Sequence, residues 1–114
     1  MLIWLVKIGE ILPDKNKNAR LLRTGILGEM LSDFGHNVVW WSSTFDHFKK
    51  KQLFAHDTDI KINDRYKIRL IRGCGYKKNV SIERIVDHKI IAKNFKNKIY
   101  QETIKPDVIV CSYP

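Results

Sequence analysis

Three runs of consecutive apolar residues constrain the fold of this 114-residue chain more than any other feature. The runs are residues 2–6 (LIWLV), 38–41 (VVWW) and 108–110 (VIV). Strands with one face in water alternate apolar and polar residues, whereas unbroken apolar runs are typical of strands buried on both faces of a parallel sheet. The three runs therefore predict an α/β fold, in which they form the central strands of a mostly parallel sheet with flanking helices.

A further strand is predicted at the edge of this sheet. Residues 66–72 alternate apolar side chains with Lys67 and Arg69, and alternation indicates one face in water. Residues 58–62 are expected either to form a hairpin with this edge strand or to precede it as a small β extension.

Two segments have helical periodicity. In residues 20–34 apolar side chains recur at helical spacing, and Gly35 is the expected C-cap. Residues 81–99 form the second predicted helix, with Ser81 as its N-cap and Glu83 near the positive end of the helix dipole. The residues predicted to face the core are Leu27, Met30, Leu31 and Phe34 in the first helix, and Ile82, Ile85, Val86, Ala92 and Phe95 in the second.

A polar loop, residues 9–19, follows the first strand after Gly9 interrupts the apolar run. In open α/β sheets, ligands bind beyond the carboxyl ends of the strands, where loop amides and helix N-termini converge. Arg20, Arg23 and Thr24 follow this loop and fall on the stripe predicted to face the sheet. We therefore expect an anionic ligand beside them. The alternative is that the arginines turn outward to solvent or pair with a neighbouring carboxylate.

Asp46 and His47 follow the second strand and so belong to the same edge of the predicted sheet. An imidazole titrates near neutral pH, so His47 is a candidate acid–base or substrate-contacting residue, with Asp46 beside it. The alternative is an ordinary surface histidine in a basic loop.

A glycine-rich loop, residues 73–79, follows the predicted edge strand. Its residues Tyr76, Lys77, Lys78 and Asn79 combine an aromatic ring and two cations with flexible backbone, which favours contact with a phosphate group. The loop matches neither the P-loop nor the dinucleotide-binding pattern. The alternative is a glycine-rich turn whose lysines are solvated.

The chain is strongly basic, with 21 Lys and Arg residues against 12 Asp and Glu residues and a formal net charge of +9. This balance predicts a polyanionic partner: a nucleic acid, an anionic lipid or a phosphorylated substrate. Lys89, Lys93 and Lys96 recur on one face of the second helix, as in basic helices that lie on anionic membranes. The alternative is a solvated helix face.

The sequence also bears on targeting, disulfides and metals. No apolar run approaches the roughly 20 residues of a membrane-spanning helix, and no secretory signal is recognised, so the predicted location is the cytoplasm. Cys74 and Cys111 are expected to be free thiols. His56, Asp57 and Asp59 lack the spacing of a credible metal site, so no metal ion is expected.

Five segments of the chain resemble the N-terminal half of family 4 glycosyltransferases of the GT-B fold. They are residues 7–13 (KIGEILP), 20–25 (RLLRTG), 35–41 (GHNVVWW), 45–47 (FDH) and 75–81 (GYKKNVS). The Gly-His-x-Val turn is widespread among GT-B proteins, whereas the Arg-Thr-Gly, Phe-Asp-His and Gly-Tyr-Lys-Lys-Asn segments together are more specific. The resemblance extends over all 114 residues.

The resemblance implies an enzyme with two Rossmann-like domains that face each other across a cleft. Such an enzyme transfers a sugar from a nucleotide-sugar to an acceptor with retention of configuration. Residues 1–114 would form an incomplete N-terminal, acceptor-side domain. The nucleotide-sugar domain, with the acidic residues of a Glu-x7-Glu motif, is expected outside these residues, so the fragment by itself is expected to be inactive. The nucleotide-sugar is a co-substrate, and no cofactor is implied.

The same resemblance assigns residues to the cleft. The backbone at Gly9 would approach the donor diphosphate, although the paired glycines common in the family are absent here. The cations would meet phosphates of the donor or of a lipid-linked acceptor. The predicted cleft residues are Gly9, Arg20, Arg23, Thr24, Asp46, His47, Tyr76, Lys77, Lys78 and Asn79.

Two broader roles remain open at this stage. The resemblance implies a role in cell-surface polysaccharide synthesis. The basic face of the second helix would then attach the protein peripherally to the inner face of the cytoplasmic membrane. The alternative function is a non-catalytic, basic Rossmann-like module that binds nucleic acid or another polyanion.

Overall fold

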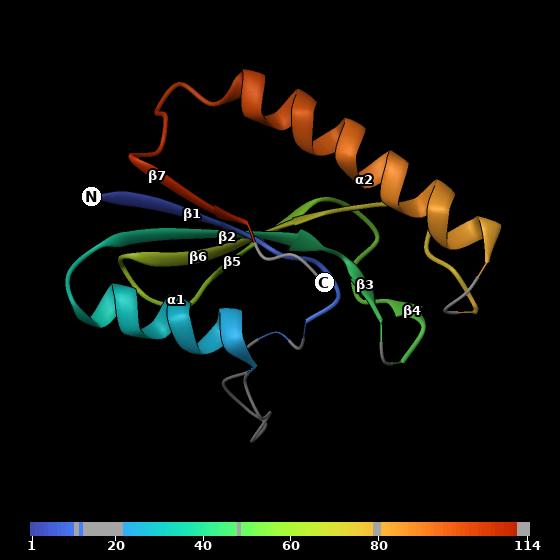
Figure 1. Ribbon diagram of the computed structural model, residues 1–114, viewed down its shortest axis with the longest axis horizontal. Coiled ribbons are helices and arrows are strands. Elements are labelled where there is room, and N and C mark those ends of the chain that lie inside the picture. The colour runs from blue at the N-terminus through green and yellow to red at the C-terminus, as the bar shows by residue number, and fades with distance from the viewer. Residues whose placement is uncertain (11, 13–21, 48, 79–80, 112–114) are drawn as a thin grey trace.

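A mixed β-sheet with a helix on each face forms the framework of the chain (Figure 1). The computed structural model describes residues 1–10, 12, 22–47, 49–78 and 81–111. Within these residues the elements are, in chain order, β1 (Leu2–Val6), α1 (Arg23–Asp33), β2 (Asn37–Ser43), β3 (Phe45–Asp46), β4 (Lys51–Gln52), β5 (Thr58–Lys61), β6 (Tyr66–Ile71), α2 (Ile82–Gln101) and β7 (Val108–Cys111).

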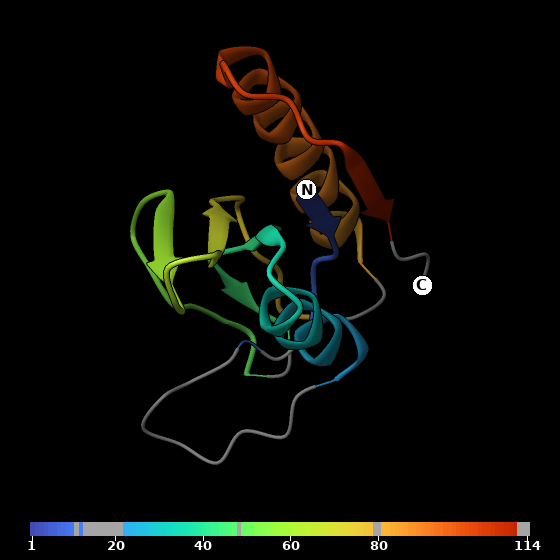
Figure 2. The ribbon, with the colours of Figure 1, turned by 90° about the vertical axis from the view of Figure 1, so that its left-hand side faces the viewer.

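Five of the described strands form the main sheet, in the order β5-β6-β2-β1-β7 from left to right in Figure 2. The pairs β1–β2, β1–β7 and β2–β6 are parallel, whereas β5 pairs with β6 in antiparallel orientation. β3 and β4 form a separate short antiparallel pair. The predicted α/β class is therefore confirmed, and the sheet is mixed.

The prediction that residues 66–72 form the edge strand is wrong. β6 lies between β2 and β5, and β5 takes the edge position. Arg69, one of the two polar positions of β6, is mostly buried: its guanidinium lies 5.0 Å from the Trp41 ring centroid and forms ion pairs with Asp59 and Glu102. At Arg69, therefore, the polar position of the alternating pattern marks an ion pair and not a side chain in water.

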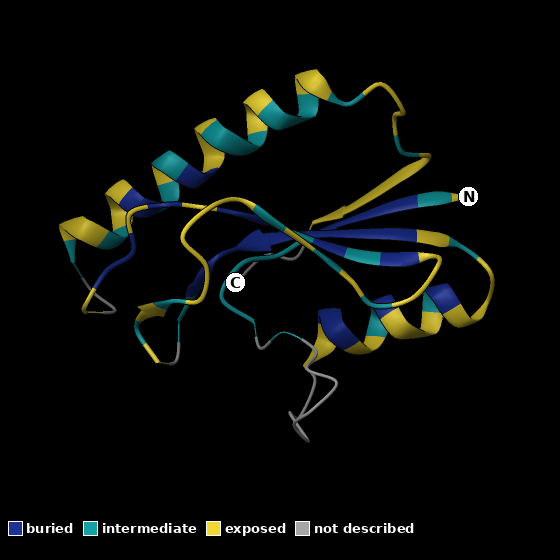
Figure 3. Ribbon diagram, turned by 180° about the vertical axis from the view of Figure 1, so that it is seen from behind, coloured by how far each residue is buried: buried dark blue, intermediate teal, exposed yellow. Residues whose placement is uncertain are grey.

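The prediction that the last apolar strand is central is also wrong. β7 lies at the other edge of the sheet, beside β1. Val108, Ile109 and Val110 are exposed although successive residues point to opposite faces, so neither described helix covers this strand (Figure 3). An apolar run indicates a strand that can be buried, but it does not determine whether helices or other strands cover it.

Each face of the sheet has its own hydrophobic core. Trp40 and Trp41 are fully buried on opposite faces because successive side chains of a strand alternate. Trp40 packs on the α1 side, where its indole Nε1 donates a hydrogen bond to the carbonyl of Lys7 over 2.9 Å. Trp41 packs on the α2 side in edge-to-face contact with Trp4 and Phe95, at centroid distances of 5.1 and 5.2 Å. The two cores hold the carboxyl ends of β1 and β2 in fixed positions.

Two predicted capping residues are confirmed: Gly35 after α1 and Ser81 before α2. Gly35, with φ +93°, follows α1, and the backbone N–H of His36 donates to the carbonyl of Leu31 over 3.1 Å. At the start of α2, the hydroxyl of Ser81 accepts a hydrogen bond from the backbone N–H of Arg84 over 3.2 Å. Local chemistry therefore determines where both helices are capped.

The stripe that α1 presents to the sheet differs from the predicted one. Met30 and Phe34, predicted to face inward, are exposed. The sheet side instead includes small residues, and a Cβ at Gly28 would lie 2.5 Å from the hydroxyl oxygen of Tyr66. The helix thus packs closely through its least bulky face. Its buried residues are Thr24, Gly25, Gly28 and Ser32.

The face that α2 presents to the sheet also differs from the predicted one. Ile82, Ile85, Val86 and Ala92 are exposed, although Phe95 does pack against the core as predicted. Asp87 and Ile91 are buried in their place. Burial of a carboxylate on this face is possible because it receives a hydrogen bond from the loop that precedes the helix, which satisfies its oxygen.

Candidate functional site

A cavity of about 490 Å³ lies beyond the carboxyl ends of β1, β2 and β6. Its walls come from the loop after β1, the segment from β2 into β3, the loop between β6 and α2, and residues 84–95 of α2. This is the edge of the sheet at which the sequence predicted a ligand site. The lining residues are Val6, Lys7, Ile8, Gly9, Trp41, Ser42, Ser43, Phe45, His47, Ile71, Tyr76, Arg84, Asp87, His88, Ile91, Ala92 and Phe95.

Tyr76 connects the walls of this cavity. Its ring is only 6% exposed and packs on the ring of Phe45, with centroids 4.7 Å apart. The Tyr76 hydroxyl forms a hydrogen bond with Nδ1 of His47, and the ring of His88 approaches it edge-on at 6.2 Å. Burial raises the pKa of Tyr76, so the hydroxyl stays protonated near neutral pH.

Two cations lie against the same ring. The Arg84 guanidinium lies 5.6 Å and the Lys50 ammonium 5.3 Å from the Tyr76 centroid, within the range of cation–π attraction. Lys50 also donates a hydrogen bond to the carbonyl of His47. Burial first, and then these two positive charges, lower the pKa of His47, although Asp46 opposes the shift. His47 therefore favours its neutral form, which can accept or donate a hydrogen bond at the cavity wall.

The loop that carries Tyr76 is held in place by side chains from two other elements. The Asp87 carboxylate, 2% exposed, accepts a hydrogen bond from the backbone N–H of Gly75 over 2.8 Å. Gln52 donates to the carbonyl of Gly73 over 3.0 Å and accepts from the hydroxyl of Thr44 over 2.7 Å. These contacts preorganise the Tyr76 position, because the loop backbone has partners from both α2 and β4.

Position 75 accepts few residues other than glycine. Its φ of +76° is a left-handed conformation that favours glycine, and an added Cβ would lie 2.9 Å from the ring of Phe45. The glycines of this loop were predicted to supply flexible backbone around a phosphate. The structure instead shows a glycine that lets the loop pack against an aromatic wall.

The N-terminus of α1 is capped by a carboxylate of the chain itself. The carboxylate of Glu10 accepts hydrogen bonds from the backbone N–H groups of Thr24 and Gly25, over 2.7 and 3.0 Å. Arg23 is exposed, which corrects the prediction that it faces inward beside Thr24. The positive end of the helix dipole therefore favours the chain's own Glu10, and an anion at this point is explained without a ligand.

The structure brings together part of the predicted site. Gly9, His47 and Tyr76 line the cavity, and an added Cβ at Gly9 would lie 3.9 Å from His47. Asp46 precedes His47 and accepts a hydrogen bond from the backbone N–H of Lys49 over 3.0 Å. The remaining predicted residues are not part of the lining: Arg23, Thr24, Lys77 and Lys78 lie elsewhere, and Arg20 and Asn79 fall outside the described residues.

Sequence reasoning missed three polar residues that line the cavity: Arg84, Asp87 and His88. They fall in the first half of α2, where Asp87 and His88 lie one helical turn after Arg84. The signal was present in their spacing, since Arg84, Asp87, His88 and Ile91 recur at helical intervals. Hydrophobicity alone favours the stripe with Ile85 and Val86, which the structure leaves exposed.

Comparisons of the chain with protein-family models, with curated proteins and with solved structures find no match. Among the described residues, no three His, Cys, Asp or Glu side chains gather in a group that could hold a metal ion. In the same part of the chain, neither helix has the length and apolar character needed to cross a bilayer.

Proposed function

We propose that this chain is the acceptor-side, Rossmann-like part of a retaining GT-B glycosyltransferase, and that its cavity binds a diphosphate-bearing substrate. The observation that carries the proposal is the convergence of three segments of the glycosyltransferase resemblance on one cavity. Gly9, His47 and Tyr76 come from three separate loops and line the same space. That space lies at the carboxyl ends of parallel strands, where α/β proteins bind their ligands.

The charge of the cavity favours an anionic ligand. Lys7 and Arg84 line it, and Lys50 lies behind the ring of Tyr76. The Asp87 carboxylate, which also lines it, is engaged by the backbone of Gly75. A guanidinium binds phosphate oxygens with two parallel hydrogen bonds, so Arg84 is the residue we assign to the phosphate.

The division of roles follows from this assignment. Arg84 holds the phosphate, His88 and His47 offer hydrogen bonds from neighbouring walls, and the buried Tyr76 ring fixes both the histidine and the cations. In this proposal the chain binds and orients the acceptor side, while the groups that activate the sugar donor lie outside residues 1–114. The chain by itself is therefore proposed to bind substrate without transferring sugar.

The proposal is tested by titrating the full chain with a nucleotide-sugar, with a short-chain prenyl-diphosphate sugar and with duplex DNA, and following backbone amide shifts by NMR. A diphosphate ligand should shift the amides of residues 7–9, 47, 76 and 84–88. Arg84→Ala should weaken binding about 10-fold or more, because a charge-assisted bidentate contact is lost. Lys61→Ala, at an exposed cation of β5 that does not line the cavity, is the matched control.

The outcomes separate the two function classes. Unchanged affinity in Arg84→Ala, or shifts that avoid the cavity amides, would refute the diphosphate site. Salt-dependent binding of duplex DNA with no response to either sugar compound would instead favour the nucleic-acid module.

We also propose that the outer face of α2 attaches the chain to anionic membranes. Lys89, Lys93 and Lys96 are exposed there as predicted. Exposed apolar side chains occupy the same face, which combines charge attraction with apolar insertion. They are Ile82, Ile85, Val86 and Tyr100, of which the first three were predicted to face the core.

Vesicle co-sedimentation tests this attachment. Neutralising Lys89, Lys93 and Lys96 together should abolish binding to vesicles containing phosphatidylglycerol, and Ile82→Ser with Ile85→Ser should weaken it independently of salt. Vesicles of phosphatidylcholine alone are the uncharged control. Equal binding of the wild type to both kinds of vesicle would contradict the role of the lysines.

A further inference from the structure

His47 gives the wall of the cavity a charge that can change. The residue lines the cavity, and its ring nitrogen Nδ1 forms a hydrogen bond with the hydroxyl of Tyr76. The centroids of the two rings are 5.8 Å apart. An imidazole gains or loses a proton near neutral pH, whereas lysine and arginine side chains keep their charge. The protonation state of His47 therefore sets part of the charge that a ligand meets.

Charged and titratable groups reach His47 from its own turn and from α2. In the turn, Lys50 donates a hydrogen bond to the carbonyl of His47, and Asp46 precedes it. From α2, Arg84 and His88 lie against the tyrosine ring that His47 contacts. Burial of the ring lowers the pKa of His47 most, followed by Lys50 and Arg84, and the opposing effect of Asp46 is smaller. The surroundings therefore keep the ring neutral near pH 7 until a negative charge joins them.

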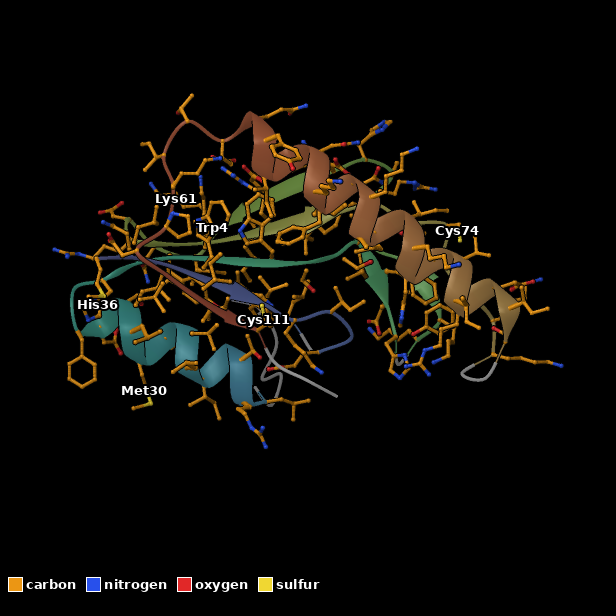
Figure 4. The ribbon with its side chains drawn as sticks, turned by 45° about the horizontal axis from the view of Figure 1, so that its top comes forward. Trp4, Met30, His36, Lys61, Cys74 and Cys111 are labelled. Atoms are coloured by element: carbon orange, nitrogen blue, oxygen red, sulfur yellow. The ribbon has the colours of Figure 1, made fainter. Side chains whose placement is uncertain are left out.

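The loop that carries Tyr76 is fixed against α2. Figure 4 shows Cys74, two residues before Tyr76, next to this helix, and the Cys74 sulfur lies 4.0 Å from the carbonyl oxygen of Glu83. The backbone N–H of Gly75 donates to the buried carboxylate of Asp87. A phenolic hydroxyl held in this way serves both forms of the imidazole, because it donates to Nδ1 of the neutral ring and accepts from Nδ1–H of the charged ring. Proton uptake thus costs no hydrogen bond at this position.

We propose that His47 takes up a proton when an anionic ligand binds in the cavity, and that it thereby determines the specificity of the site for anions. The inference rests on the proposed function, because it requires a phosphate-bearing ligand in the same cavity. Lys50 and Arg84 oppose a proton on the ring, and a phosphate bound by Arg84 offsets this repulsion. The bound anion and the proton then stabilise each other, whereas an uncharged ligand gains nothing from the proton.

This coupling makes the affinity for an anion depend on pH in a fixed direction. A bound anion raises the pKa of His47 above that of the unliganded ring. The affinity is therefore lowest at high pH, rises as pH falls through the pKa of the ligand-bound ring, and levels off below the pKa of the unliganded ring. The expected increase is about 10-fold between about pH 8 and pH 5, which corresponds to a single charge-assisted contact.

Isothermal titration calorimetry of the full chain tests the proposal with the nucleotide-sugar and the prenyl-diphosphate sugar as probes. Both are diphosphate diesters, so their charge is constant over this range of pH. Titrations in two buffers of different ionisation enthalpy measure proton uptake, and the wild type should take up a fraction of a proton at about pH 6.5 and little at about pH 8. His47→Gln should abolish the uptake and flatten the pH dependence. His56→Gln, at an exposed histidine that does not line the cavity, should change neither.

A second measurement needs no variant. In NMR titrations of the wild-type imidazole, the pKa of His47 should rise when either probe is added at saturation. Circular dichroism checks that His47→Gln is folded before its proton uptake is interpreted.

Three results would overturn the inference while leaving the diphosphate site in place. They are binding of a probe without proton uptake, uptake that His47→Gln retains but His88→Gln removes, and a His47 pKa that does not rise on binding. Failure of both probes to bind would refute this inference together with the proposed function.

Discussion

The carboxylate of Asp87 accepts a hydrogen bond from the backbone N–H of Gly75 over 2.8 Å, and this contact joins the second helix to the loop that carries Tyr76. The carboxylate is almost completely buried, with 2% of the residue exposed. A buried polar group of this kind must be satisfied, so the position of the loop and the rotation of the helix depend on each other. The candidate site is built on that dependence.

Replacing Asp87 should therefore destabilise the fold as well as the site. Asp87→Ala should lower the free energy of unfolding by about 1–3 kcal/mol, because the N–H of Gly75 loses its partner in a buried location. Asp87→Asn retains an acceptor oxygen and serves as the matched control. Urea denaturation measures both values, and an equal loss in the two variants would show that the hydrogen bond contributes nothing.

Gly28 and Tyr66 offer a second test, in the contact between α1 and the sheet. Gly28→Ala should cost about 1–3 kcal/mol, since the new Cβ would overlap the Tyr66 hydroxyl. That hydroxyl is buried without a hydrogen-bond partner in the described part of the chain, so Tyr66→Phe should be neutral or stabilising. The double variant should recover part of the loss, and strict additivity of the two changes would contradict the direct contact.

Glu10 should stabilise α1 by accepting hydrogen bonds at the N-terminus of the helix. Glu10→Ala removes an acceptor from the N–H groups of Thr24 and Gly25, and we expect a loss of about 1–2 kcal/mol in thermal or urea unfolding. Glu10→Gln keeps the acceptor without the charge and should recover much of this loss. Equal stability of the wild type and Glu10→Ala would show that the cap is not formed in solution.

The pKa of His47 should lie below its ordinary value of 6.5, owing first to burial and then to the charges of Lys50 and Arg84. NMR titration of the imidazole measures it, and Lys50→Ala should raise it. Since the folded state favours the neutral ring, this contribution to stability is complete above the unfolded pKa and is lost as pH falls through the folded pKa. His47→Gln should therefore lose less stability than the wild type on acidification from pH of about 7.5 to 5.

Much of the local structure could be predicted from particular residues. The apolar run of residues 2–6 is β1, and Ser81 and Gly35 cap the helices beside them. These features depend on neighbouring residues, so sequence patterns report them directly. The carboxyl ends of parallel strands share an edge, and the glycosyltransferase resemblance assigned Gly9, His47 and Tyr76 to one cleft there; these three residues do line one cavity.

Other features depended on contacts between distant residues. The alternation of β6 predicted an edge strand with one face in water. In the structure Arg69, on that face, forms ion pairs with Asp59 and Glu102. The arginine at position 23 was predicted beside a ligand, but Glu10 already occupies the end of its helix. In both cases the partner is remote in sequence, so a local pattern cannot indicate whether a charge meets water, a ligand or another side chain.

By itself, the sequence determined the α/β class, the approximate positions of both helices and of the strands of the main sheet, and the edge of the sheet where the cavity forms. These follow from short-range periodicity, turn residues and caps, each of which acts within a few residues. The tertiary structure alone decided the order of the strands, the rotation of α1 and α2, and the entry of Arg84, Asp87 and His88 into the cavity. The physical reason is that a polar residue takes an inward position only when a distant part of the chain supplies its hydrogen bond, as Gly75 does for Asp87.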